Sequence, residues 1–210
     1  MRTRTGILPA GGKALRWQGL PKECLPIHNG LTLVSRNVKI LQKMRCDPVV
    51  IVTTPEREAV LRYVLRDWEG VEYTYNDQGL LASCLEACRY APNDEYVMIM
   101  PDTIFNGQVF PYPLESSFYM GMFDTNYPER FGTLRDGQIV DKAPSTQTER
   151  AWGTLAWKEH VTQFWLKRGD VDQNIAFTAA IKAFGVEDLP ISFYVDIASF
   201  EDYLGYLRGV

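Results

Sequence analysis

The chain has 210 residues, of which 46% are apolar and 23% charged, a composition typical of a globular protein with one domain. Its formal net charge of −4 argues against a broad electrostatic grip on nucleic acid or anionic lipid, so a phosphate site would need local cations or a metal. No apolar run approaches the length of a membrane span or a signal peptide. The four cysteines are not spaced as zinc ligands or as a disulfide framework. We therefore expect a reduced, cytoplasmic protein.

The first half of the chain alternates short apolar runs with amphipathic stretches. Strands are predicted over residues 5–10, 48–53, 71–75 and 96–100, and helices over 33–44, 55–66 and 81–88. This alternation predicts a parallel, doubly wound sheet with right-handed crossovers. Ligands of such sheets bind beyond the carboxyl ends of the strands, where the loop after Ala10 and the residue Asp102 both lie.

The second half of the chain is predicted to be richer in short strands. Strand candidates are 117–123, 131–134, 138–142, 151–157 and 191–195, and helices are predicted over 158–168, 171–184 and 199–207. Asp136-Gly137, between two of these strands, is a hairpin turn signal. Because no repeat or linker interrupts the chain, we expect one α/β domain over residues 1–210, with a doubly wound, mostly parallel sheet and a small inserted β-rich lobe.

The loop after the first strand combines glycines with cations. It contains Pro9, Ala10, Gly11, Gly12 and Lys13, followed by Arg16 and Lys22. Glycines let backbone N–H groups approach a ligand closely, and the arginine and lysine side chains can bind phosphate oxygens. A P-loop would need glycine and Ser/Thr where the chain has Ile7 and Ala14, and the dinucleotide GxGxxG pattern is absent from this loop. The alternative interpretation is a glycine turn with solvated surface cations.

The segments LPAGGKALRW and PKECLPI, at residues 8–17 and 21–27, resemble the opening signature of nucleotidyltransferases with a GT-A-type α/β fold. The most similar members are sugar-1-phosphate nucleotidyltransferases and the cytidylyltransferases that act on methylerythritol phosphate. Further resembling segments follow in the family's order: GLLAS at 79–83, PDTIF at 101–105, PERFG at 128–132, IVDKAP at 139–144, WGT at 152–154 and YVDIASFEDY at 194–203. The resemblance implies a nucleotide-diphospho-sugar transferase-like fold, with about residues 1–110 binding the nucleotide and about 111–210 the acceptor.

The resemblance also implies roles for individual residues. The catalytic residues would be Asp102 together with Arg16 and Lys22, which would hold the triphosphate, and Asp102 and Asp196 would be ligands of one Mg²⁺. Nucleotide contacts are expected from Pro9, Ala10, Gly11, Gly12, Lys13 and Gly79, and acceptor contacts from Gly132, Asp141, Lys142 and Gly153. The alternative for each aspartate of the metal pair is a turn- or helix-capping role, and for Lys142 an exposed lysine at a strand end.

The implied reaction is attack by a phosphate oxygen of a sugar 1-phosphate on the α-phosphorus of a nucleoside triphosphate, with release of pyrophosphate. A phosphate monoester has a second pKa of roughly 6, so this nucleophile is largely dianionic at neutral pH and needs no general base. His28 and His160 are therefore interpreted as ordinary surface or loop residues. The obstacle is repulsion between anions, which alignment and charge neutralisation would overcome, and two carboxylates plus phosphate oxygens suit Mg²⁺.

Other functions are weighed against this one. The acceptor could be a different phosphorylated compound, such as phosphocholine, a polyol phosphate or molybdopterin, although the DKAP segment favours sugar phosphates. A GT-A glycosyltransferase would use a DxD metal motif, but the DVD segment at 170–172 is better explained as a helix N-cap. A catalytically silent domain would have no need for Arg16, Lys22, Asp102 and Asp196 together.

Several properties stay open from the sequence. It identifies neither the base nor the acceptor nor the pathway, and it leaves the oligomeric state open, including a homo-oligomer. The expected partners are a nucleoside triphosphate and a small phosphorylated substrate, with no nucleic acid and no membrane. No stretch after the last motif could form a β-helix or acyltransferase extension, so we expect a single activity.

Overall fold

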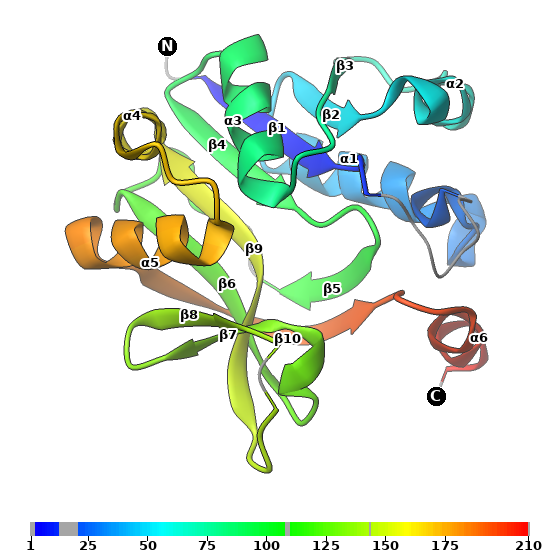
Figure 1. Cartoon of the computed structure of the whole chain (residues 1–210). Helices are drawn as coiled ribbons and strands as arrows, with labels where there is room; N and C mark the ends of the chain where they lie inside the picture. Colours follow the sequence, from blue (N-terminus) through cyan, green and yellow to red (C-terminus); the bar gives the residue numbers. More distant parts are fainter. Residues whose placement is uncertain (1–2, 13–20, 108–109, 143, 210) are drawn as a thin grey trace.

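A computed structural model describes residues 3–12, 21–107, 110–142 and 144–209 of the chain (Figure 1). The predicted phosphate-binding residues Lys13 and Arg16 lie outside these ranges. Within them, no helix combines the length and the apolar character needed to cross a bilayer.

The N-terminal half forms the parallel part of the sheet, in the order β3-β2-β1-β4 with every neighbouring pair parallel. The elements in chain order are β1 (Arg4–Pro9), α1 (Leu33–Lys43), β2 (Val49–Thr53), α2 (Pro55–Val64), β3 (Val71–Tyr75), α3 (Leu80–Tyr90) and β4 (Glu95–Ile99). Each of these was predicted from apolar periodicity, and the observed ends lie within two residues of the predicted ones.

Helices cover both faces of this parallel part. Successive side chains of β1 point to opposite faces, so Leu8 packs in a core with residues of α1 and α2, whereas Ile7 packs in a second core. The second core contains residues of α3, α4 (Glu159–Arg168) and α5 (Gln173–Phe184). Cys84 and Cys88 belong to it as free, buried thiols, as predicted. The expected α/β class, with a sheet wound on both sides, is confirmed.

The C-terminal half continues the sheet with mixed pairing, in the order β4-β9-β6-β10-β5. Its strands are β5 (Thr103–Gly107), β6 (Phe118–Thr125), β7 (Gly132–Arg135), β8 (Gln138–Asp141), β9 (Glu149–Lys158) and β10 (Glu187–Asp196), and α6 (Phe200–Arg208) follows. Strand β9 is antiparallel to both β4 and β6, and β10 is parallel to β6. The β7–β8 hairpin pairs with β9 beside the main strand order. The other strands of this half, from which a β-rich lobe was predicted, continue the main sheet.

Strand β5 was not among the predicted strands. It begins at Thr103, within the PDTIF segment and directly after Asp102, and pairs antiparallel with β10, with Thr103 opposite Asp196. Its strand conformation depends on pairing with β10, about ninety residues away in the chain. The residues of β5 themselves show no pattern that predicts a strand. The pairing matters because it joins two of the segments that carry predicted site residues.

Two local predictions about turns and caps are confirmed. Asp136 and Gly137 have φ angles of 49° and 72°, the left-handed backbone that a tight hairpin turn requires. Asp172 caps α5, because its Oδ1 accepts hydrogen bonds from the backbone N–H groups of Asn174 and Ile175 at 2.8 and 3.0 Å. The DVD segment is therefore a helix cap, as the sequence indicated, although the capping residue is Asp172 and α5 begins at Gln173, two residues later than predicted.

Candidate active site

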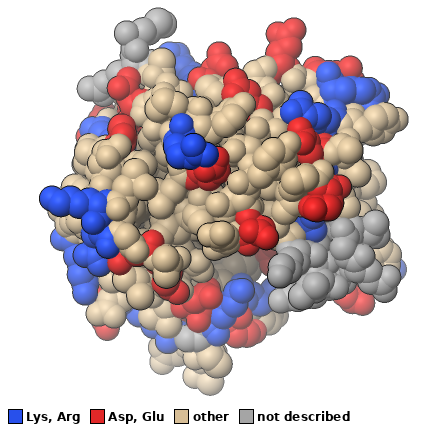
Figure 2. Space-filling view, turned by 45° about the horizontal axis from the view of Figure 1, so that its top comes forward, with Lys and Arg blue, Asp and Glu red and all other residues tan. Residues whose placement is uncertain are grey.

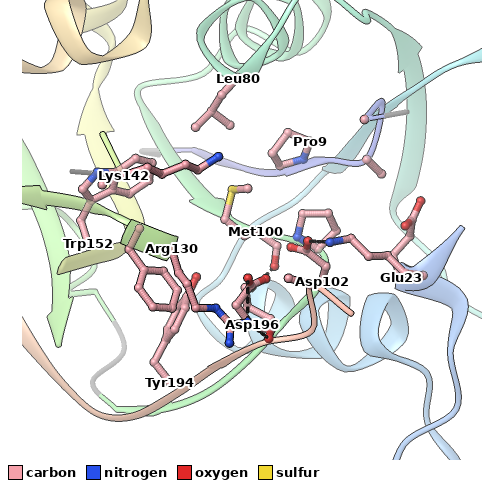
Figure 3. Close-up of a pocket in the computed structure, with 18 of the residues that line it drawn as sticks. Pro9, Glu23, Leu80, Met100, Asp102, Arg130, Lys142, Trp152, Tyr194 and Asp196 are labelled. Atoms are coloured by element: carbon pink, nitrogen blue, oxygen red, sulfur yellow. Dashed lines mark hydrogen bonds and ion pairs between the residues drawn. The ribbon is translucent and has the colours of Figure 1, made fainter. Parts of the chain in front are cut away.

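On the face shown in Figure 2, basic and acidic side chains are interspersed over the surface. The charges that could bind a phosphorylated ligand are instead gathered in one pocket of about 680 Å³. It lies beyond the carboxyl ends of β1 and β4 and is bounded on its other side by residues of the β7–β8 hairpin, β9 and β10 (Figure 3). This is the place at which ligands bind in open α/β sheets.

Most of the predicted site residues in the described ranges line this pocket. They are Pro9, Ala10, Gly12, Lys22, Asp102, Gly132, Asp141, Lys142 and Asp196. Three predicted glycines, Gly11, Gly79 and Gly153, do not line it, although each lies next to a residue that does. Lys22 and Lys142 come from opposite sides of the pocket, and Figure 3 shows Lys142 extending across it toward Leu80 and Pro9.

The glycines have packing or backbone reasons for being glycine. A Cβ on Gly11 would lie 2.3 Å from the carbonyl oxygen of Asn76, and one on Gly153 would lie 2.2 Å from the ring of Tyr194. Gly79 has a φ of 107° directly before α3, a conformation that other residues rarely adopt. Gly11 therefore allows the loop after β1 to approach the segment after β3, and Gly153 makes room for an aromatic side chain of β10.

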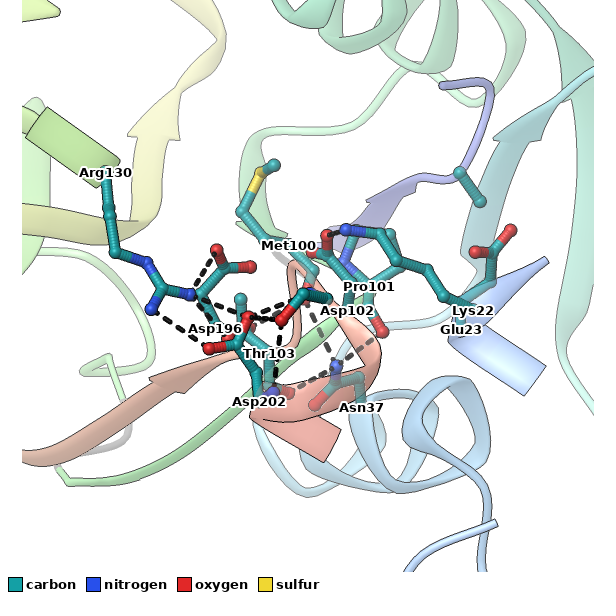
Figure 4. Close-up of polar contacts among 12 residues, drawn as sticks. Lys22, Glu23, Asn37, Met100, Pro101, Asp102, Thr103, Arg130, Asp196 and Asp202 are labelled. Carbon is teal, nitrogen blue, oxygen red and sulfur yellow. Dashed lines mark hydrogen bonds and ion pairs between the residues drawn. The ribbon is translucent and has the colours of Figure 1, made fainter. Parts of the chain in front are cut away.

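Asp102 and Asp196 are brought together by the pairing of β5 with β10. Thr103 lies opposite Asp196, and the N–H of Ile197 donates to the carbonyl oxygen of Asp102 at 3.1 Å. Burial, and next the charge of Asp102, raise the pKa of Asp196 to about 6. Two carboxylates that are far apart in the sequence therefore share one partly desolvated space (Figure 4).

Lys22 forms an ion pair with Oδ2 of Asp102. The other carboxylate oxygen, Oδ1, is buried and has no hydrogen-bond partner among the described residues. An unsatisfied buried carboxylate oxygen next to a second carboxylate suits a hard cation, which prefers oxygen ligands. Across the described ranges, no three His, Cys, Asp or Glu side chains cluster as metal ligands, so the remaining ligands of such a cation would come from a substrate or water.

Asn37, which the sequence analysis did not select, holds the turn that carries Asp102. This fully buried side chain of α1 donates from Nδ2 toward the carbonyl oxygens of Met100, Pro101 and Thr103, at 3.2, 3.3 and 3.1 Å. A signal for it existed in the sequence, because Asn37 interrupts the apolar stripe of α1 at a position that faces the core. A polar residue at such a position must find a partner.

Arg57 is a second residue that the sequence analysis missed. It lines the pocket from α2, and its Nη1 donates to Oε1 of Glu23 at 3.2 Å and to the carbonyl oxygen of Ala10 at 3.4 Å. Burial raises the pKa of Glu23, which is almost inaccessible to solvent. Arg57 thereby connects the loop after β1 to the short 3-10 helix η2 (Lys22–Cys24), which carries Lys22.

A third such residue, Arg130, links the region of the β7–β8 hairpin to the carboxylates of Asp196 and Asp202. It ends the short 3-10 helix η4 (Pro128–Arg130) just before β7. Its guanidinium donates to both carboxylate oxygens of Asp202 at 3.0 Å and to the carbonyl oxygen of Asp196 at 3.2 Å. The sequence signal was the PERFG segment itself, from which only the glycine was selected.

Neither histidine contributes to the pocket. His28 is exposed, with its ring centroid 5.1 Å from that of Tyr206, and His160 is exposed and hydrogen-bonded to Oγ of Ser117 at 2.9 Å. Among the described lining residues there is no histidine and no cysteine. Chemistry in this pocket would therefore be carried by lysine, arginine and carboxylate side chains.

The architecture belongs to the class of nucleotide-diphospho-sugar transferase-like α/β folds, as solved structures show. A Bacillus anthracis protein named as a candidate glucose-1-phosphate thymidylyltransferase matches with a TM-score of 0.83 and 19% identity, over 98% of this chain and 94% of its own. A UDP-glucose pyrophosphorylase from Acinetobacter baumannii matches with a TM-score of 0.79 and 13% identity, over 99% and 93%. At these identities the likeness defines the fold.

The chain belongs to the family of the MobA-like NTP transferase domain, which matches residues 6–112. The resemblance noted in the sequence is thus confirmed, and with it the class of nucleotidyltransferases. A glucose-1-phosphate thymidylyltransferase from Neisseria meningitidis is 25% identical over 145 residues, which are 61% of this chain and 50% of the relative. The match thus spans about half the length of that curated relative.

Proposed function

We propose that the protein transfers a nucleotidyl group from a nucleoside triphosphate to a sugar 1-phosphate, with Mg²⁺, to give a nucleoside-diphosphate sugar and pyrophosphate. One observation carries this proposal. A single pocket gathers the ion pair of Lys22 and Asp102, the neighbouring carboxylate of Asp196 and, from the opposite side, Lys142. The family and the relatives described above support a nucleotide and a sugar phosphate as the two ligands.

The nucleotide would bind on the side formed by the N-terminal half. Pro9, Ala10 and Gly12 line the pocket there, and Leu80 lines it from the first turn of α3, directly after Gly79. Lys22 is close enough to Asp102 to be paired with it, so it stands next to the place where a triphosphate would meet a metal. We assign Lys22 to the α-phosphate, where negative charge grows as the reaction proceeds.

Asp102 and Asp196 would hold Mg²⁺ through their carboxylate oxygens, including the unpartnered Oδ1 of Asp102. When bound, the metal would neutralise charge on the phosphates of the nucleotide. It would also offset the repulsion between the two carboxylates, which otherwise favours protonation of Asp196.

The acceptor would bind on the side formed by the hairpin. Asp141 ends β8 opposite Gly132 of β7, and Lys142 follows with its N–H donating to the carbonyl oxygen of Phe131 at 2.9 Å. The side chains of Trp152 and Tyr194 complete this side of the pocket. Lys142 would bind the acceptor phosphate, and Asp141, one carbon shorter than the glutamate of the resembling motif, would bind sugar hydroxyl groups.

The chemistry balances without a proton transfer. A phosphate oxygen of the acceptor forms a bond to the α-phosphorus while the bond from that phosphorus to the bridging oxygen breaks, and the electron pair leaves with pyrophosphate. Because the nucleophile is already ionised, the chain must align two anions and neutralise their charge. The absence of histidine and cysteine from the described pocket lining fits this requirement.

A substrate matrix tests the proposal. Each nucleoside triphosphate is paired with several sugar 1-phosphates and, in parallel, with phosphocholine and polyol phosphates, and pyrophosphate release is measured. We expect turnover with at least one sugar 1-phosphate. Turnover confined to the other acceptors would overturn the sugar assignment, and no release from any pair would overturn the proposed reaction.

The carboxylate assignment is tested with Asp102→Asn and Asp196→Asn. Each should lower turnover by orders of magnitude at saturating Mg²⁺ while the chain stays folded. The matched control is Asp136→Asn, at an exposed turn where Asn accepts the same left-handed backbone. Near-full activity in either test variant would rule that residue out as a metal ligand.

A further inference from the structure

Arg130 occupies a place between the two halves of the pocket. It ends η4, two residues before Gly132, and its guanidinium reaches Asp196 at the end of β10 and Asp202 in α6. Figure 4 shows it pointing toward Asp196 and Asp202. Its side chain is 35% exposed, so it lies at the pocket wall and is partly accessible to solvent.

Asp202 provides a fixed anchor for this guanidinium. It is the third residue of α6, and its Oδ2 accepts hydrogen bonds from the N–H and Oγ of Ser199 at 2.8 and 2.9 Å. The hydroxyl of Ser199 in turn accepts from the N–H of Asp202 at 3.1 Å. This reciprocal cap at the start of α6 immobilises the carboxylate, so a guanidinium bonded to both of its oxygens is immobilised as well.

The anchored guanidinium directs the second N–H of its Nη2 toward Asp196. Nη2 of Arg130 lies 3.2 Å from the backbone oxygen of Asp196 and 3.6 Å from its Oδ2. The first is a hydrogen bond, and the second is an electrostatic contact too long for a hydrogen bond. The Asp196 carboxylate thus has the positive charge of Arg130 beside its Oδ2, while the negative charge of Asp102 also acts on it.

We propose that Arg130, fixed by Asp202, is a positioning residue that orients the Asp196 carboxylate toward Asp102 and ties the acceptor hairpin to that carboxylate. This inference rests on the proposed function, in which Asp196 is a metal ligand. Only arginine can do this here, because its planar fork bonds both oxygens of one carboxylate while a further N–H reaches a second group. A lysine would keep the charge and lose the fixed direction.

The test compares Arg130→Lys and Asp202→Asn with a matched control. Arg135→Lys removes the fork of a nearby arginine at the end of β7, whose side chain is also 35% exposed and pairs with Glu149 at 2.6 Å. Arg135 does not line the pocket. Mn²⁺ binding to the free protein, measured by electron paramagnetic resonance, reports the carboxylate site without any turnover. Thermal unfolding and kcat and KM for both substrates are measured alongside.

Both test variants should weaken Mn²⁺ binding and lower kcat by roughly 10-fold or more, as changes to residues that orient metal ligands do, while KM for the nucleotide changes little. Arg135→Lys should leave Mn²⁺ binding within about twofold of the unaltered chain. Asp202→Asn keeps an oxygen for the Ser199 cap, so a loss in this variant reports the contact with Arg130 and not an unfolded helix.

The outcomes separate this inference from the function beneath it. If Asp196→Asn abolishes Mn²⁺ binding but Arg130→Lys and Asp202→Asn leave it unchanged, the positioning role is wrong and the metal site stands. A loss of Mn²⁺ binding in Arg135→Lys equal to that in the two test variants would also overturn the positioning role. The effect would then not depend on the contacts of Arg130 with Asp202 and Asp196. If the unaltered protein binds no Mn²⁺, the proposed metal site is wrong, and the positioning role of Arg130 is wrong as well.

Discussion

Replacement of Asn37 by alanine should both destabilise the chain and impair turnover, although Asn37 does not line the pocket. The side chain is fully buried in α1 and donates from its amide to three carbonyl oxygens of the turn that carries Asp102. Its two N–H bonds can serve only two of these oxygens well at a time, so the three contacts are shared. Alanine removes both donors. The oxygen of Met100 still accepts a hydrogen bond from Oγ1 of Thr103 at 2.8 Å, so the loss falls on the carbonyl oxygens of Pro101 and Thr103.

The magnitude follows from these contacts. Two hydrogen bonds contribute roughly 1 kcal/mol each, and the unpaired buried acceptors add about 1–3 kcal/mol. Alanine is the better helix former by roughly 0.5 kcal/mol, which offsets part of the loss. We therefore expect the free energy of unfolding to fall by about 2.5–4.5 kcal/mol, which for a chain of this size lowers Tm by roughly 5–18 °C.

Chemical and thermal denaturation measure the stability of Asn37→Ala, and pyrophosphate release measures its kcat below the new Tm. Asn37→Asp is a second variant that keeps the size but directs a carboxylate at carbonyl oxygens, and it should lose at least as much. Asn174→Ala, at a partly exposed position in the first turn of α5, is the control and should change stability by no more than about 0.5 kcal/mol. A loss below about 1 kcal/mol with unchanged kcat in Asn37→Ala would refute the role of Asn37.

Two further predictions concern the lysines and the histidines. Lys22→Ala should depress turnover most, by a transition-state cost of roughly 3–4 kcal/mol, because charge on the α-phosphate grows during the reaction. Lys142→Ala should chiefly raise KM for the acceptor, and titration calorimetry with each ligand separately would contradict this placement if nucleotide binding weakened instead. Replacing His28 and His160 together should leave the pH–rate profile unchanged, and loss of a pKa near 6.5 would show that one of them takes part.

The parallel half of the fold could be read from the sequence because its signals are local. The apolar run at residues 49–53, without polar alternation, indicates a buried strand. Apolar side chains at helical spacing indicate the buried faces of α1 and α3. Each pattern lies within a single element. The hairpin turn at Asp136-Gly137 and the cap at Asp172 were equally local, because each depends on the backbone or side-chain chemistry of one or two residues. The order of the short motifs then identified the family.

Only the tertiary structure decided which distant residues meet. Asp102 and Asp196 become neighbours because β5 pairs with β10, and β5 has no local pattern that distinguishes it from a loop. The supports of these carboxylates, Asn37 and the pair of Arg130 with Asp202, come from still other parts of the chain. Hydrogen bonds and ion pairs of this kind depend on direction and distance between elements, which periodicity and turn chemistry do not encode, so they arise only once the sheet is assembled.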